Sequence, residues 1–256
     1  MIFTIAAKEL KGLFASPLAW MVLTAVQVIS GYAFLKRLDD FLQIQPQLVQ
    51  LASPPGVTEL VVTPLYATTA IVLLFAVPLL GMRSIAEERR NQTMVFLTSA
   101  PVSISQIVLG KFLGLTLFVL LIVLLVTAMP LTLATSTHLD YGLIASLCAG
   151  LILIAAAFSA VSLYISCLTT YPMAAAFGAF AALLLMILMG EAAADGLRAR
   201  GWQLPAAFVQ VFSPMKNFEP LGKGLVDTYA IACSIMLVVV FIVLAVRRLD
   251  GRRLRG

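Results

Sequence analysis

Ionisable side chains concentrate in one short segment of this 256-residue sequence, at 83–105. Its centre reads Glu87-Glu88-Arg89-Arg90, and Thr93 follows closely. Four successive charges spread around a helix, so a short helix over 84–97 would offer ion-pairing groups on several sides. Such a helix between two apolar runs is a surface on which a cytoplasmic partner could push. The alternative is a solvated loop that merely carries the excess of Lys and Arg typical of cytoplasmic loops.

Catalytic patterns are otherwise missing from the sequence. It has no G-x-x-x-x-G-K-[ST] phosphate loop, and Gly110-Lys111 lacks the glycine that would have to precede it. The single histidine, His138, belongs to no H-E-x-x-H motif, and no G-x-S-x-G motif occurs. Cys148, Cys167 and Cys233 lie in apolar stretches and predict helix packing rather than a metal site or disulfides. We therefore expect no metal, no cofactor and no catalytic residue.

The elements that must position the charged segment are membrane spans. The sequence is 61% hydrophobic and 11% charged, far below the charge of soluble domains. One crossing needs about 20 apolar residues, and the uncharged run 141–190 is long enough for two, broken at Thr169-Thr170-Tyr171-Pro172. We predict an all-α polytopic membrane protein. Its six spans are expected at roughly 18–35, 60–82, 110–133, 142–168, 173–190 and 229–246.

Lys and Arg predict the orientation of these spans. An even number of spans puts both termini on one side, together with Lys8, Lys11, the 83–105 segment, Lys111 and the arginines of the C-terminal tail. The other side carries fewer cations, which Asp and Glu balance. Both termini should thus be cytoplasmic, in the inner (cytoplasmic) membrane of a bacterium. The net charge of +5 reflects this bias toward anionic lipid, so no nucleic acid partner is expected.

Two further segments complete a single domain over 1–256. Residues 1–16 are amphipathic and predict an interfacial elbow helix, after which Ser16-Pro17 starts the first span. Residues 191–228 form the larger extracytoplasmic segment, in which Pro205 to Phe212 is apolar but too short to span. Small residues recur at helical spacing in spans four and five: Ala145/Ala149, Ala156/Ala160 and Ala174/Gly178/Ala182. These faces could pack within the chain or against a second copy.

Several short motifs occur in an order typical of one family. They are Lys8-Glu9-Leu10, Phe14-Ala-Ser-Pro17-Leu, Ala86-Glu-Glu-Arg-Arg90, Thr98-Ser-Ala-Pro-Val-Ser103, Gln106-Ile-Val-Leu-Gly-Lys111, Leu139-Asp-Tyr-Gly142, Ser166-Cys-Leu-Thr169, Ser213-Pro-Met-Lys-Asn-Phe-Glu219 and Gly224-Leu-Val-Asp227. Over nearly the whole chain, the sequence resembles the type-2 ABC exporter permeases. The nearest branch is that of the gliding-motility and nitrous-oxide-reductase-maturation permeases. The family typically has a glycine before the threonine and a glutamate two residues after it, where this chain has Gln92 and Val95.

The resemblance implies a permease that works as a dimer, with a second copy or a related permease, and with cytoplasmic ABC ATPase subunits that bind the ATP. Segment 83–105 would be the coupling segment, and Glu87, Glu88, Arg89, Arg90 and Thr93 would contact the ATPase. ATP hydrolysis would drive export of a substrate. The alternative function is a force-transmitting membrane component that acts on an extracytoplasmic partner protein without moving a solute. A secondary carrier is less consistent, because no charge lies near the middle of a predicted span.

Overall fold

The computed structural model describes residues 1–48, 56–92, 103–135, 137, 139–200, 202 and 211–253, and within these residues it contains helices and no strand. Six helices are long and apolar enough to cross a membrane, which confirms the predicted all-α polytopic class. The elements are α1 (Ile2–Ala15), α2 (Pro17–Leu48), η1 (Thr58–Val62), α3 (Thr63–Gly81), α4 (Ala86–Arg90), α6 (Ile104–Leu131), η2 (Thr132–Thr135), α7 (Tyr141–Leu168), α8 (Pro172–Ala199), α10 (Pro214–Gly222) and α11 (Thr228–Arg253).

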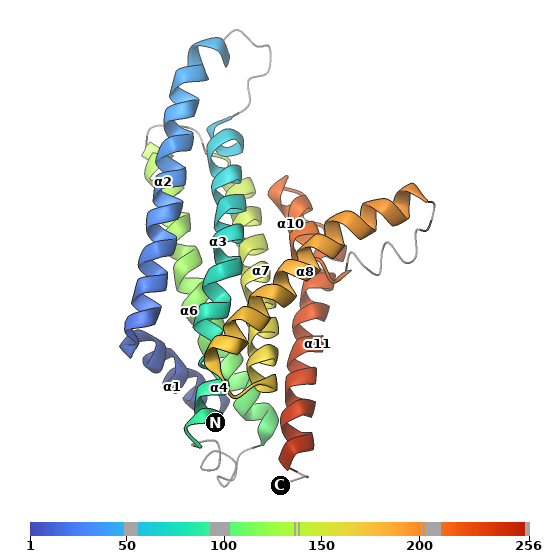
Figure 1. Ribbon diagram of the computed structural model, residues 1–256. Helices are drawn as coiled ribbons and strands as arrows, with labels where there is room; N and C mark the ends of the chain where they lie inside the picture. Colours follow the sequence, from blue (N-terminus) through green and yellow to red (C-terminus); the bar gives the residue numbers. More distant parts are fainter. Residues whose placement is uncertain are drawn as a thin grey trace.

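Both chain termini lie at the same end of the bundle, which we call the terminal end (Figure 1). The amphipathic helix α1 lies there at an angle to α2, from which Ser16 separates it. Pro17 is the first residue of α2, as the sequence predicts. The short helix α4 lies at the same end, between α3 and α6. The segments expected to be an elbow and a coupling element are therefore neighbours.

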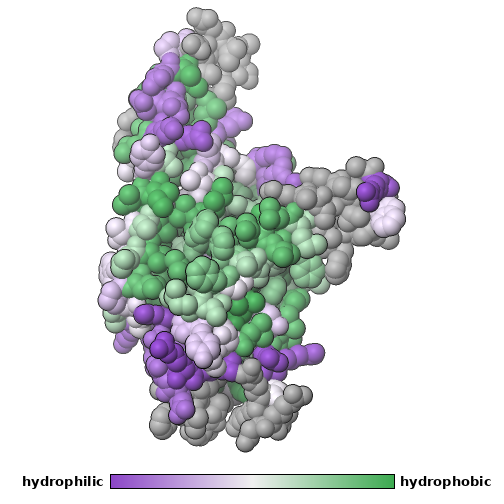
Figure 2. All heavy atoms as spheres, viewed as in Figure 1, coloured by the Kyte–Doolittle hydropathy of each residue, from purple (hydrophilic) through white to green (hydrophobic). Residues whose placement is uncertain are grey.

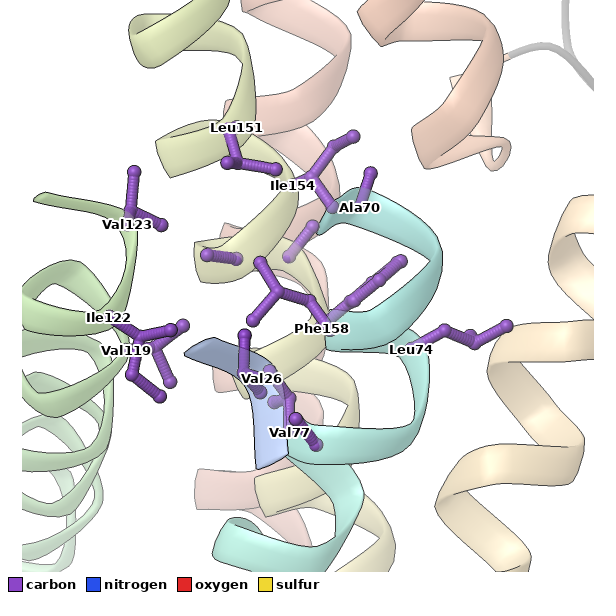
Figure 3. Packing of buried hydrophobic residues seen from close by; sticks show 14 of the residues in the cluster. Val26, Ala70, Leu74, Val77, Val119, Ile122, Val123, Leu151, Ile154 and Phe158 are labelled. Carbon is purple, nitrogen blue, oxygen red and sulfur yellow. The ribbon is translucent and has the colours of Figure 1, made fainter. Parts of the chain in front are cut away.

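The core lies between α2, α3, α6 and α7. Phe158 of α7 is fully buried and packs beside Val26 of α2, Leu74 of α3 and Val119 of α6 (Figure 3). These helices are also linked by hydrogen bonds between side chains, one of which joins Tyr66 to Thr127 at 2.8 Å. Hydrogen bonds between side chains of different helices stabilise helix association within a membrane, where no water is available to pair with these polar groups.

The outer surface of the bundle is apolar. Figure 2 shows a broad band of hydrophobic residues around the middle, with hydrophilic residues above and below it. Phe75, Phe177 and Met236 are all more than half exposed within this chain. Soluble monomers rarely expose apolar patches of such extent, so the band is a surface for lipid or for another membrane subunit.

Helix boundaries follow local signals in the sequence. Ser103 accepts a hydrogen bond from the Gln106 amide at 3.4 Å and caps α6. Asp140 caps α7 in the same way, through the Leu143 amide at 3.1 Å. The predicted break before Pro172 is confirmed, since α7 ends at Leu168 and α8 begins at Pro172.

Two expected boundaries differ from the structure. The helix predicted over 84–97 is wrong for 84–85 and for 91–92, because α4 covers only Ala86–Arg90. The helix ends before Gln92, whose φ of 58° does not occur in a right-handed helix. Residues 93–102, with Thr93, lie outside the described residues. Helix α8 continues past the predicted span end at 190 to Ala199. Most of the apolar piece 205–212 also lies outside the described residues.

The small-residue faces fall into two groups. Ala160 is buried in a cluster with Ala245 of α11, and Gly178 lies close to Ile165 of α7. These two faces therefore pack within the chain. Ala145 and Ala149 are exposed, so the structure does not assign them a partner within the described chain.

Candidate functional site

The N-terminus of α4 is fixed to the end of α7. The backbone amides of Ile85 and Ala86 donate to the hydroxyl oxygen of Ser166, at 3.2 and 3.0 Å. The Ser166 hydroxyl in turn donates to the carbonyl oxygen of Met82 at 3.3 Å, and its side chain is fully buried. Amides at the start of a helix have no partner within the helix, so this one hydroxyl satisfies two of them. A side chain of α7 thus sets the position of α4.

Arg89 makes a second connection between α4 and α7. Its guanidinium donates to the carbonyl oxygens of Cys167 at 2.7 Å and of Thr169 at 3.5 Å. The last carbonyls of a helix lack partners within it and carry partial negative charge, so a cation is favourable there. Arg89 therefore anchors α4 where α7 ends and the turn to α8 begins.

Lys111 of α6 makes the third connection and is 1% exposed. Its ammonium forms an ion pair with Glu88 of α4 at 2.9 Å and another with Glu9 of α1. It also donates to the carbonyl oxygen of Ser84 at 2.7 Å. A buried ammonium is costly unless it is paired and hydrogen-bonded, and these three oxygens match its three N–H donors. Lys111 thus holds α1, α4 and α6 together.

Close backbone contact between α1 and α6 brings Glu9 within reach of Lys111. A β-carbon added at Gly110 would lie 2.7 Å from Ile5, and one at Gly114 would lie 2.6 Å from Glu9. Real side chains do not come so near one another, so both positions require glycine at this helix separation. The two glycines flank the lysine and form a groove for α1.

The remaining charges of α4 face outward. Glu87 pairs with Arg83 at 3.5 Å, but both side chains are more than 40% exposed, so the pair contributes little to stability. Arg90, Asn91 and Gln92 are exposed. Gln92 adopts the left-handed conformation, which suits the glycine typical of the family at this position.

The structure separates the predicted ATPase-contacting residues into two sets. Glu88 and Arg89 make buried or half-buried contacts with other helices, whereas Glu87 pairs with Arg83 at the surface and Arg90 is exposed. Thr93 lies outside the described residues. The role of all five residues at an ATPase remains a prediction.

Sequence reasoning missed Lys111, Glu9 and Ser166 as parts of this site. Lys111 was counted among the cations of the cytoplasmic side, and its burial in α6 was not predicted. The available signal was its position between Gly110 and Gly114, because two glycines four residues apart mark a close helix contact. Nothing in the spacing of Glu9 or Ser166 indicates their partners, which are distant in the chain.

A bundle of six apolar helices that are long enough to cross a membrane defines a polytopic membrane protein. The chain belongs to the ABC-2 transporter family: the model of that family, described as an ABC-2 family transporter protein, matches residues 3–253. No curated protein matches the chain. It is therefore a multi-pass membrane permease component of an ABC transporter, of a family that generally works with a cytoplasmic ABC ATPase and as a dimer or pair.

Proposed function

We propose that this chain is the permease subunit of an ABC exporter from the gliding-motility and nitrous-oxide-reductase-maturation branch. A separate ATPase subunit binds and hydrolyses the ATP, and the permease itself has no cofactor. Residues of segment 83–105, with Glu87 and Arg90 at its exposed side, dock on that ATPase. The functional unit pairs this chain with a second copy or a related permease.

The observation that carries this proposal is the set of contacts made by α4. A five-residue helix of marginal stability by itself is connected to α7 through Ser166 and Arg89, and to α1 and α6 through Lys111. A force applied to its exposed side reaches three helices through buried polar contacts. This is what a coupling element requires.

The charge distribution supports a cytoplasmic terminal end. Helices α1 and α4 and the end of α11 lie at this end and carry Lys8, Lys11, Arg90, Arg247 and Arg248, and cytoplasmic segments have an excess of Lys and Arg. An ATPase in the cytoplasm of a bacterium would then meet α4 directly, at the inner membrane.

At the far end, one part of segment 191–228 is folded into the bundle and another part projects from it. Helix α10 is folded into the bundle: Ser146 of α7 donates to the Leu221 carbonyl at 2.9 Å, and Phe218 packs against Gly150. The C-terminal part of α8, in contrast, extends away from the bundle (Figure 1), so force transmission to an external protein remains the alternative function.

The test is co-purification with the ATPase encoded beside this chain, followed by measurement of ATP hydrolysis. Reversal of the exposed charges, Glu87→Arg with Arg90→Glu, should abolish binding or stimulation of the ATPase while membrane insertion stays normal. Reversal of all four charges of 87–90 should do the same and also loosen the junction. The matched control exchanges the exposed far-end pair, Glu219→Lys with Lys223→Glu, which are 3.0 Å apart. Normal binding and stimulation by the reversed proteins would overturn the proposal.

A further inference from the structure

A cavity of about 260 Å³ lies at the terminal end, where α1, α2, α3, α4 and α6 meet. Its lining combines ionisable side chains with leucines from helix ends that lead into the apolar band. The ionisable residues are Lys8, Glu9, Arg83, Glu87 and Glu88. The leucines are Leu13, Leu18, Leu80 and Leu115. An amphipathic lining of this kind suits a ligand that is itself part charged and part apolar.

The cavity lies at the end of the bundle where the apolar band gives way to hydrophilic residues. Trp20 follows it at the start of α2, is 51% exposed, and donates from its indole nitrogen to the Phe14 carbonyl at 2.7 Å. Tryptophan is enriched where the apolar and polar layers of a membrane meet. In Figure 2 the apolar band ends at this part of the bundle and hydrophilic residues begin. A lipid headgroup at this boundary would lie next to the cavity.

The charges favour a headgroup that carries both signs. Within the described residues, Lys8 has no ion-pair partner, so its ammonium is available to a phosphate. Glu87 pairs only loosely with Arg83, at 3.5 Å with both side chains substantially exposed, so its carboxylate is available to an ammonium group. Glu9 and Glu88 also line the cavity, but both are already paired with Lys111, so Glu87 is the lining carboxylate that can face a bound ammonium group. A phosphate joined to a primary ammonium matches both charges.

The size of the cavity agrees with one such headgroup. Its volume equals that of about nine water molecules at ~30 Å³ each, which accommodates a phosphate and an ammonium group. Gly12 lines the cavity, and a β-carbon added there would meet no atom within 4 Å. A bulky side chain at position 12 can therefore enter this space from α1 without a clash at its β-carbon.

We propose that this cavity binds the headgroup of one phosphatidylethanolamine molecule of the adjacent leaflet, with its phosphate at Lys8 and its ammonium at Glu87. Lipid bound there contacts α1, α2 and the segment that leads into α4. The proposal concerns the chain without a bound ATPase, because Glu87 is also the residue proposed to contact that partner, and the test therefore uses the chain by itself.

The test places the purified full-length chain in nanodiscs with equal amounts of phosphatidylethanolamine, phosphatidylcholine and phosphatidylglycerol. Native mass spectrometry then counts the lipids that remain bound. We expect the wild type to retain one phosphatidylethanolamine per chain that Gly12→Trp does not retain. Phosphatidylcholine should not replace it, because its quaternary ammonium has no N–H to donate to a carboxylate. The matched control is Gly251→Trp in α11, where a β-carbon also meets nothing within 4 Å.

Two isosteric or near-isosteric variants keep the proposal testable if Gly12→Trp disturbs α1. Lys8→Gln should weaken retention of phosphatidylethanolamine at least tenfold, and Glu87→Gln should remove the preference over phosphatidylcholine. The proposal is overturned if Gly12→Trp, or the two charge variants, retain as much phosphatidylethanolamine as the wild type. A preference for phosphatidylglycerol at this site would overturn it as well.

Discussion

Lys111 is a cation in a span whose other described residues are uncharged, and its environment explains why it is tolerated. Two carboxylates and one carbonyl surround its ammonium, and they come from α4, α1 and the turn before α4. Removal of one partner from a buried pair leaves an uncompensated charge, which costs far more than the pair contributes. A substitution that removes one of these charges should therefore destabilise the protein, whereas replacement of all three charged side chains by neutral ones should be tolerated.

We predict that Lys111→Met destabilises the protein by about 3–5 kcal/mol, because Glu9 and Glu88 then face each other without a cation. The triple variant Glu9→Gln, Lys111→Met, Glu88→Gln should recover most of this loss. The measurement is denaturant unfolding in mixed micelles, followed by tryptophan fluorescence. Equal stability of the single and triple variants would rule out a buried ionic network.

Among the described non-glycine residues, only Gln92 has a positive φ. The left-handed region costs a side-chain-bearing residue about 1 kcal/mol, so Gln92→Gly should slow hydrogen exchange in 86–92 by up to roughly fivefold. The control is Asn91→Gly, where φ is −84° and glycine should speed exchange. Opposite signs for these neighbours would confirm the turn, and equal signs would contradict it.

At the scale of elements, α1 packs on α6 through glycines rather than through large side chains. A β-carbon at Gly114 would lie 2.6 Å from the Glu9 β-carbon and 3.0 Å from the Ala6 carbonyl oxygen. Both neighbours belong to the backbone or to the root of a side chain, so α1 itself would have to move. The ion pair of Glu9 with Lys111 depends on this close contact.

We predict that Gly114→Ala destabilises the protein by about 1–3 kcal/mol through overpacking and speeds hydrogen exchange in residues 2–15. The control is Gly31→Ala in α2, where the β-carbon meets only Met129 at 3.7 Å. That change should be neutral or slightly stabilising, because alanine favours a helix. If both variants unfold at the same temperature, α1 does not depend on the glycine groove.

At the scale of the whole molecule, both termini lie at one end, and the charge bias predicts that this end is cytoplasmic. In a variant with Cys148, Cys167 and Cys233 replaced by alanine, we expect a membrane-impermeant maleimide to label Lys223→Cys in intact spheroplasts. Gly251→Cys should react only after permeabilisation. The reverse labelling pattern would contradict the orientation and with it the site proposed for the ATPase.

The sequence by itself determined the helical spans, because lipid admits only long apolar runs and each run is bounded by charge, proline or a capping residue. Ser103 before α6 and the break before Pro172 are read locally, from residues adjacent in the chain. The charged segment at 87–90 was recognised in the same way. The helix predicted for this segment was too long, because the sequence does not show that the backbone at Gln92 adopts a positive φ.

Only the tertiary structure decided which charges turn inward. Glu9 and Lys111 are 102 residues apart, and Arg89 reaches a carbonyl 78 residues away. Pairing at such separations depends on how helices approach one another, through contacts such as those at Gly110 and Gly114, and no local pattern encodes it. Burial also sets the cost of losing a partner: the exposed pair of Arg83 and Glu87 contributes little to stability, whereas removal of one partner from the buried pair of Lys111 and Glu88 is costly.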